Sequence, residues 1–167
     1  MSSTPLKFLH PATLISTWFG SGLIKFAPGT WGSLAALPFA WVIFGQFGWI
    51  GLVIASLLAY VIGIWASGKY SEALGREDPG SVVIDEVAGQ WLALAIVPLD
   101  PFLYLLSFLL FRFFDIVKVF PANWLDKNVK GGLGIMSDDM VAGLYALAIF
   151  YLFQRFVPYD GEMFKFF

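Results

Sequence analysis

The spacing of apolar stretches constrains the fold of this chain more than any other feature. A helix needs about 20 apolar residues to cross the hydrocarbon core of a bilayer. The second and fifth stretches approach that length, whereas the first and third are short and are expected to be tilted, interfacial or re-entrant. The five stretches comprise residues 33–45, 49–67, 84–98, 102–118 and 139–157.

The composition also indicates a membrane protein. Of the 167 residues, 59% are hydrophobic and only 13% are charged, whereas about 25% of the residues in soluble domains are charged. We therefore predict an all-α fold, in which residues 1–167 form one integral membrane domain with a bundle of four to five apolar helices. The net charge of −2 and the lack of a basic stripe argue against nucleic-acid binding.

The distribution of charge predicts which side of the membrane carries the chemistry. If each stretch crosses once, one face holds the N-terminus and the polar segments near residues 25–33, 68–83 and 119–138. Eight of the ten lysines and arginines and nine of the twelve acids belong to this face. Because cytoplasmic loops are enriched in Lys and Arg, we expect this face to be cytoplasmic, with its acids at the level of the lipid headgroups.

Two similar motifs predict that two helices approach each other closely. The segments "DEVAG" (85–89) and "DMVAG" (139–143) both read D-x-x-A-G. The acid and the glycine of each motif lie four residues apart and share a helix face, and small residues allow membrane helices to pack closely. We expect Asp85 and Asp139 to meet. The alternative is two unrelated acids that stabilise helix N-termini.

The segment "APGTWGS" (27–33) is expected to form a turn that precedes a helix. Thr30 or Ser33 would then cap that helix. The backbone N–H groups around Thr30, Gly32 and Ser33 would form a site for a phosphate group. The alternative is a capped helix start without a ligand.

Two further polar segments belong to the same face. In "FRFFDIVK" (111–118), Arg112, Asp115 and Lys118 are spaced by three and form one helical stripe, which acts either as an ion-pair ladder or as part of a site. The glycine-rich segment 121–139 is expected to be a long loop, either flexible or able to bring its backbone close to a ligand, and it carries Lys130 and two acids at its end.

The available side chains restrict the metal that this face can bind. The chain has no cysteine and a single histidine, His10. Carboxylates without nitrogen or sulfur ligands favour Mg²⁺ over Zn²⁺ or iron. Mg²⁺ held by carboxylates commonly binds phosphate, and arginine can bind the remaining phosphate oxygens. The sequence therefore predicts a Mg²⁺-assisted reaction on the phosphate of a lipid headgroup.

Four segments carry a resemblance to a known family. "FAPGTWGS", "DEVAGQW", "FRFFDIVK" and "GGLGIMSDDMVAG" occur in this order between about residues 17 and 150, and they resemble the bacterial phosphatidylglycerophosphatase A family. The resemblance implies a multi-pass enzyme of the inner membrane. It implies Mg²⁺-dependent hydrolysis of phosphatidylglycerophosphate to phosphatidylglycerol and phosphate in phospholipid biosynthesis. It also implies these site residues: Asp85, Glu86, Asp115, Asp138 and Asp139.

Together these observations give a hypothesis for each candidate residue. Asp115 is expected to orient or deprotonate the attacking water, with a covalent aspartyl-phosphate as the alternative route. The predicted ligands of one or two Mg²⁺ ions are Asp85, Glu86, Asp138 and Asp139, of which Asp139 is also assigned to catalysis. The predicted phosphate-binding residues are Arg112, Lys118, Thr30, Gly32, Ser33 and Lys130.

Two other functions compete with the phosphatase. The first is a transporter or channel with a carboxylate-lined ion site on its cytoplasmic side, since acids in membrane helices also mark ion paths. A pore should carry acids at several depths, whereas the acids of this chain are expected at one face. The second is a non-catalytic scaffold in which Mg²⁺ bridges lipid headgroups.

Overall fold

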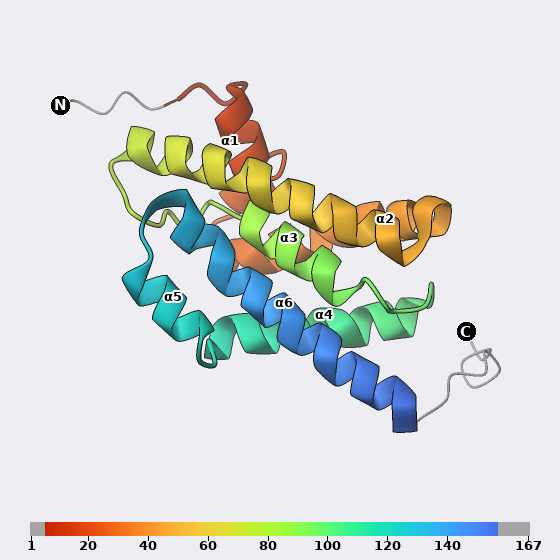
Figure 1. Ribbon diagram of the computed structural model, residues 1–167. Helices are drawn as coiled ribbons and strands as arrows, with labels where there is room; N and C mark the ends of the chain where they lie inside the picture. Colours follow the sequence, from red (N-terminus) through yellow and green to blue (C-terminus); the bar gives the residue numbers. More distant parts are fainter. Residues whose placement is uncertain (1–5, 157–167) are drawn as a thin grey trace.

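A computed structural model describes residues 6–156. All regular secondary structure in that range is helical, and turns and short loops connect the helices (Figure 1). The predicted all-α fold is therefore confirmed. Two helices, α2 and α6, are long and apolar enough to cross a membrane. The elements are α1 (Pro11–Ser16), the 3₁₀ helix η1 (Ser21–Leu23), α2 (Pro28–Leu74), α3 (Ile84–Ala93), α4 (Pro101–Val117), α5 (Ala122–Asn128) and α6 (Gly131–Phe156).

Helix α2 is a helical hairpin. Gly48 interrupts it with φ 63° and ψ −165°, a conformation that glycine adopts without steric cost. The chain reverses direction at this end of α2 (Figure 1). The predicted stretches 33–45 and 49–67 are therefore the two limbs of the hairpin. The first limb, residues 28–47, is about 30 Å long at 1.5 Å per residue, which is enough to cross the hydrocarbon core.

Helix α3 is the short central element of the bundle. Its ten residues span about 15 Å, and eight of them are buried. It contacts α2, α4 and α6. Residues 94–100 then continue without helix to the start of α4 at the far end of the molecule (Figure 1). The third apolar stretch is thus a buried helix of half length, in line with the expectation that some segments are short or re-entrant.

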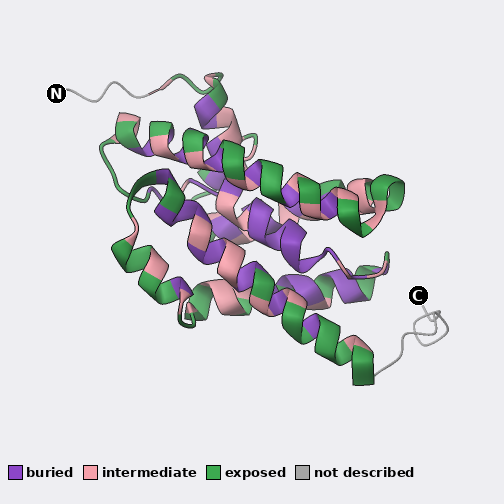
Figure 2. Ribbon diagram, in the orientation of Figure 1, coloured by how far each residue is buried: buried purple, intermediate pink, exposed green. Residues whose placement is uncertain are grey.

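The side chains are distributed as expected for a bundle in lipid. In the second limb of α2, Leu57, Val61 and Trp65 are exposed, whereas Gly63 and Ser67 are buried. Figure 2 shows the same outward exposure on α4 and α6. Small residues at helix contacts and large apolar residues outside are typical of membrane helices. In water this surface would be an extended apolar patch.

Helices α3 and α6 touch through the two D-x-x-A-G motifs. A Cβ atom added to Gly143 would lie 2.5 Å from the carbonyl oxygen of Gly89, and one added to Gly89 would lie 2.5 Å from that of Asp139. Ala88 and Ala142 are fully buried beside them. The predicted close approach is confirmed, and it brings the N-terminal end of α3 against the first turns of α6.

The prediction for residues 27–33 is wrong in its local structure. Helix α2 begins at Pro28, and Ala27 in a left-handed conformation precedes it without a side-chain cap. Thr30 therefore lies within the first turn and Ser33 within the second, where its hydroxyl donates to the carbonyl of Gly29 at 2.9 Å. Neither residue caps the helix, because proline starts the helix earlier than the expected cap position.

The predicted flexible loop at 121–139 is also wrong, because α5 and the first turns of α6 occupy it. A Cβ on Gly132 would collide with the carbonyl of Ile64, and one on Gly134 with the carbonyl of Val129. These glycines allow close backbone packing rather than mobility. The last stretch consequently begins at Gly131, eight residues earlier than expected. The C-terminal residues 157–167 lie outside the described range.

The glycine contact predicts a specific loss of stability. Gly143→Ala should lower the stability of the purified protein in detergent by about 1–3 kcal/mol, the usual cost of overpacking a filled interface. The matched control is Gly45→Ala, because its added methyl group would have only an ordinary contact, 3.7 Å from Leu99 Cδ1. Thermal unfolding of both variants measures the difference. Equal midpoints would contradict the close α3–α6 contact.

Candidate active site

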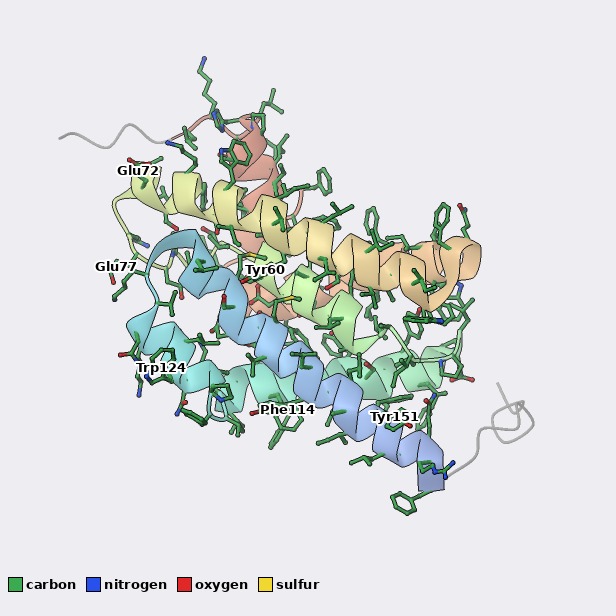
Figure 3. The ribbon with its side chains drawn as sticks, viewed as in Figure 1. Tyr60, Glu72, Glu77, Phe114, Trp124 and Tyr151 are labelled. Carbon is green, nitrogen blue, oxygen red and sulfur yellow. The ribbon has the colours of Figure 1, made fainter. Side chains whose placement is uncertain are left out.

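A polar cavity of about 160 Å³ opens where α3, α4, α5 and α6 meet the connection between α2 and α3. This end of the bundle carries Glu77 and Trp124, and Tyr151 of α6 lies toward the other end (Figure 3). Eight acids and two lysines line the cavity, and they include all five acids predicted as site residues. These ten residues are Glu77, Asp78, Asp85, Glu86, Asp115, Lys118, Asp126, Lys130, Asp138 and Asp139.

Three carboxylates form the centre of the site. One oxygen each of Asp85, Glu86 and Asp139 lie within 4.8 Å of one another. Asp85 and Glu86 belong to the first turn of α3, where the positive end of the helix dipole favours negative charge. Asp139 comes from the third turn of α6 and is 3% exposed. The glycine contact between the two helices is what brings these carboxylates together.

Several oxygen atoms of this group have no hydrogen-bond partner. Asp85 Oδ1, Glu86 Oε2 and Asp139 Oδ2 are buried and unpaired. Buried polar atoms are rarely left without a partner, because each unpaired group costs free energy. A hard divalent cation takes carboxylate oxygens as ligands. The three residues therefore fit Mg²⁺ as a set of ligands. No described side chain forms a hydrogen bond to these three oxygen atoms.

Arg112 lies behind the acids rather than in the cavity. Its Nη1 atom forms an ion pair with Asp115 on the same helix and lies 3.6 Å from Glu86 Oε1. The same atom donates to Ser33 Oγ at 3.5 Å. Arg112 does not line the cavity. Of the ion-pair ladder considered as an alternative for this helix, only the pair between Arg112 and Asp115 is present, and Arg112 holds two acids in place.

Lys118 connects three helices at the rim of the cavity. It caps the end of α4 in a left-handed conformation with φ 49°, so it leaves the stripe of Arg112 and Asp115 on which it was predicted. Its ammonium donates to Asp126 of α5 at 2.6 Å and to Asp138 of α6 at 2.7 Å. Burial lowers the pKa of Lys118, but the two carboxylates outweigh burial and raise it above its usual value.

Asp138 differs from the other predicted ligands. It lines the cavity, but its Oδ2 accepts from Lys118, and it lies outside the group of three carboxylates. Its Oδ1 is buried without a partner. Asp138 is therefore positioned beside the three-carboxylate group, between that group and the lysine.

The predicted phosphate-binding residues lie in different places. Lys130 lines the cavity, whereas Thr30, Gly32 and Ser33 do not. The start of α2 instead supports the site from behind: a Cβ on Gly29 would collide with the Glu86 carboxyl, and one on Gly32 would lie 2.6 Å from Val83 Cβ. This segment was expected to bind the ligand directly, but its glycines make room for α3.

The sequence analysis did not single out two acids of the cavity. Glu77 and Asp78 lie in the connection between α2 and α3, and Glu77 accepts from Lys130 at 2.7 Å. Desolvation raises the pKa of Asp78 above its usual value, while Lys118 lowers it and Asp126 raises it. Both acids belong to segment 68–83, which was predicted to share one face with the other candidate acids, and both line the cavity with them. No pattern in the sequence showed that their connection folds over the start of α6.

The contact between Lys118 and Asp138 predicts an energetic coupling. Lys118→Gln would leave the Asp138 carboxylate, 8% exposed, without its cation. We expect a loss of about 1–2 kcal/mol in stability, a reduced value because Lys118 is itself about one-third exposed. Asp138→Asn in the same chain should restore part of this loss, as a double-mutant cycle in detergent would show.

The control for this cycle is Lys130→Gln, because the ion pair between Lys130 and Glu77 is exposed. This change should leave unfolding unaltered. Additive effects of the Lys118 and Asp138 substitutions would contradict the direct contact.

Comparisons with known proteins identify the family. The model of the family "Phosphatidylglycerophosphatase A" matches residues 14–154. The chain is 36% identical to phosphatidylglycerophosphatase A of Escherichia coli over 95% of its length and 92% of the relative. It is 38% identical to the protein of that name in Haemophilus influenzae, over 91% of this chain and 96% of the relative.

A third relative carries another name. The putative phosphatidylinositol-3-phosphatase of Bacteroides thetaiotaomicron is 40% identical over 81% of this chain and 89% of the relative. No solved structure matches the chain. The family model and the two long alignments confirm the resemblance inferred from the four segments: the chain belongs to the phosphatidylglycerophosphatase A family and is a phosphatase.

Proposed function

We propose that this enzyme hydrolyses the terminal phosphate of phosphatidylglycerophosphate, yielding phosphatidylglycerol and inorganic phosphate. Two relatives that match nearly the whole chain carry the name of this activity. The observation that carries the proposal is the group Asp85, Glu86 and Asp139, whose unpaired buried oxygens border a polar cavity at one end of an apolar bundle.

The shape of the site suits the headgroup of a lipid. The cavity of about 160 Å³ is polar and is lined by charged residues, so it suits a phosphate group, while acyl chains remain outside. Next to Lys118, the end of α4 exposes Ile116 (70%) and Val117 (52%), and the connection to α5 exposes Phe120 (68%). A substrate with its acyl chains beside these residues would extend its phosphate toward Lys118 and the acids.

The charge of the cavity supports a role for Mg²⁺. Its lining includes eight acids and only two lysines, so an anionic phosphate would be repelled unless cations neutralise the acids. Asp85, Glu86 and Asp139 would hold Mg²⁺, with Asp138 adjacent. The bound ion would neutralise phosphate oxygens and stabilise the charge that develops during phosphoryl transfer.

The protein side chains would then have distinct tasks. Lys118 and Lys130 line the cavity and would bind phosphate oxygens. Asp115 would orient the attacking water and accept its proton, and the ion pair with Arg112 fixes the Asp115 side chain. The water oxygen bonds to phosphorus, and the bond from phosphorus to the glycerol oxygen breaks. The glycerol oxygen leaves and takes a proton from solvent water, and Asp115 returns its proton to solvent, so that the protein regains its starting state. Arg112 is thus a positioning residue.

The position of the cavity favours an enzyme over a pore. The acids that line it lie at one end of the bundle, and among the described residues only Asp100 is placed at the other end, where it caps α4. An ion path would require acids at several depths. We infer that the cavity faces the cytoplasm in the bacterial inner membrane, because most lysines and arginines belong to this end.

Phosphate release tests the proposal. Purified protein in detergent should release phosphate from phosphatidylglycerophosphate with Mg²⁺ present and lose this activity with a chelator. Asp139→Asn should reduce the rate at least about 100-fold, because ligand and supporting groups of metal sites commonly contribute that much. The matched control is Glu72→Gln, an exposed acid at the same end but outside the cavity (Figure 3).

Phosphatidylinositol 3-phosphate serves as the second substrate in this assay, because one relative is named for it. If phosphate is released faster from phosphatidylinositol 3-phosphate, that lipid is the preferred substrate and the proposed substrate is wrong. Absence of release from both lipids would contradict the proposed function.

Isotope labelling distinguishes the two chemical routes. In a single turnover in ¹⁸O-labelled water, direct attack by water places the label in the released phosphate and leaves the protein unlabelled. An aspartyl-phosphate intermediate that water attacks at phosphorus would also place the label in the released phosphate. Rapid acid quenching must therefore show in addition that no phosphoprotein forms. Phosphate bound covalently to a peptide that contains Asp115, Asp138 or Asp139 would overturn the direct route.

A further inference from the structure

A second hollow lies on the other side of the connection that borders the acid cavity. It measures about 360 Å³ and lies between residues 22–28 and residues 74–81. Arg76 and residues 79–81 line this hollow, whereas Glu77 and Asp78 line the acid cavity. One short connection therefore separates two sites of opposite charge.

Two cations without partners line the second hollow. Lys25 and Arg76 are both exposed, and no acid lines the hollow with them. Within residues 6–156, neither side chain takes part in an ion pair or a hydrogen bond. Lys69, Arg112, Lys118 and Lys130 are paired with acids, whereas the other described cations without an ion pair, Lys7, Lys127 and Arg155, do not line this hollow. Unpaired cations that share a concave surface attract an anion.

The start of α2 adds to this positive charge. Pro28, the first residue of the helix, lines the hollow, and no acid occupies the first turn. The positive end of the helix dipole therefore lies at the hollow, and the Glu86 carboxyl, which packs against Gly29 from the other side, offsets part of it. This contribution is secondary to that of Lys25 and Arg76.

Exposed apolar side chains occur among the lining residues 22–28 and just before them in the sequence. Phe26 is 82% exposed, Phe19 64%, Leu23 48% and Ile24 42%. Large apolar side chains next to exposed cations are typical of segments that lie in the membrane interface, where the apolar groups enter the acyl region and the cations meet the headgroups. The hollow is therefore at the depth of lipid phosphates.

We propose that this hollow binds the phosphate of an anionic phospholipid other than the lipid under hydrolysis. The ligand is a phosphodiester headgroup held by Lys25 and Arg76, with its acyl chains beside Phe26 and Ile24. This site is distinct from the one proposed for the substrate, because the connection that carries Glu77 and Asp78 lies between the two linings. A lipid bound there would contact residues 76–81 on the side opposite to the acid cavity and would stabilise the position of this connection.

Lipid binding to the full-length protein tests this proposal. Native mass spectrometry in a neutral detergent should show one phosphatidylglycerol bound more tightly than phosphatidylcholine with the same acyl chains. The double substitution Lys25→Gln and Arg76→Gln should weaken this binding about thirtyfold, the effect of two basic residues at an anionic lipid surface. Equal binding by the wild type and this variant would overturn the proposal.

A matched variant controls for net charge. Lys7→Gln with Lys127→Gln removes two exposed cations that do not line the hollow, and it should leave phosphatidylglycerol binding within about twofold. A loss equal to that of the first variant would show general attraction to the surface and would overturn the proposed site. Competition by millimolar inorganic phosphate alone would also overturn it, because the ligand would then be free phosphate.

A separate measurement keeps this result independent of the proposed activity. Phosphate release from a short-chain phosphatidylglycerophosphate in detergent should be the same for the wild type and the Lys25/Arg76 variant, because neither residue lines the acid cavity. Weakened lipid binding with unchanged release supports the second site. Lost release with unchanged lipid binding overturns it.

Discussion

The contact between α3 and α6 determines the position of every other part of the site. Gly89 and Gly143 allow the two backbones to meet at a distance that a methyl group would prevent. Asp85, Glu86 and Asp139 lie one helical turn from this contact and are therefore held within a few ångströms of one another. Their mutual repulsion is opposed by packing that extends through the centre of the bundle, so stability and chemistry share one interface.

The charges around the three carboxylates are arranged in two layers. Behind them, Arg112 holds Glu86 and Asp115 on the side of α2 and α4. At the rim, Lys118 joins Asp126 and Asp138 and thereby connects α4, α5 and α6. Among the described residues, Asp85 and Asp139 form no ion pair, whereas the outer acids Asp126 and Asp138 share Lys118. Such a difference favours an added metal ion at depth and an exchangeable lysine near the entrance.

The sequence predicted the helical class, the end of the bundle that carries the acids, and the meeting of Asp85 with Asp139, because these depend on local periodicity and on charge. It did not predict that residues 27–33 are helical, or that Gly132 and Gly134 are packing positions. Glycine is typical both of flexible loops and of tight helix contacts, and only the partner backbone distinguishes them. The role of the connection at residues 75–83 depends on tertiary contacts that no local pattern contains.

The reversal of α2 at Gly48 gives the protein two unequal ends. The described chain turns there within a few residues. The connection between α3 and α4, residues 94–100, is also short. The opposite end carries α1, α5, both pockets and most of the ionic contacts. Within residues 6–156, the end at the Gly48 turn presents mainly apolar side chains, which also line a hollow between Ile43 and Leu58. Within this range, a soluble regulator that recognises charged side chains would therefore meet the protein at the end that carries the acid cavity.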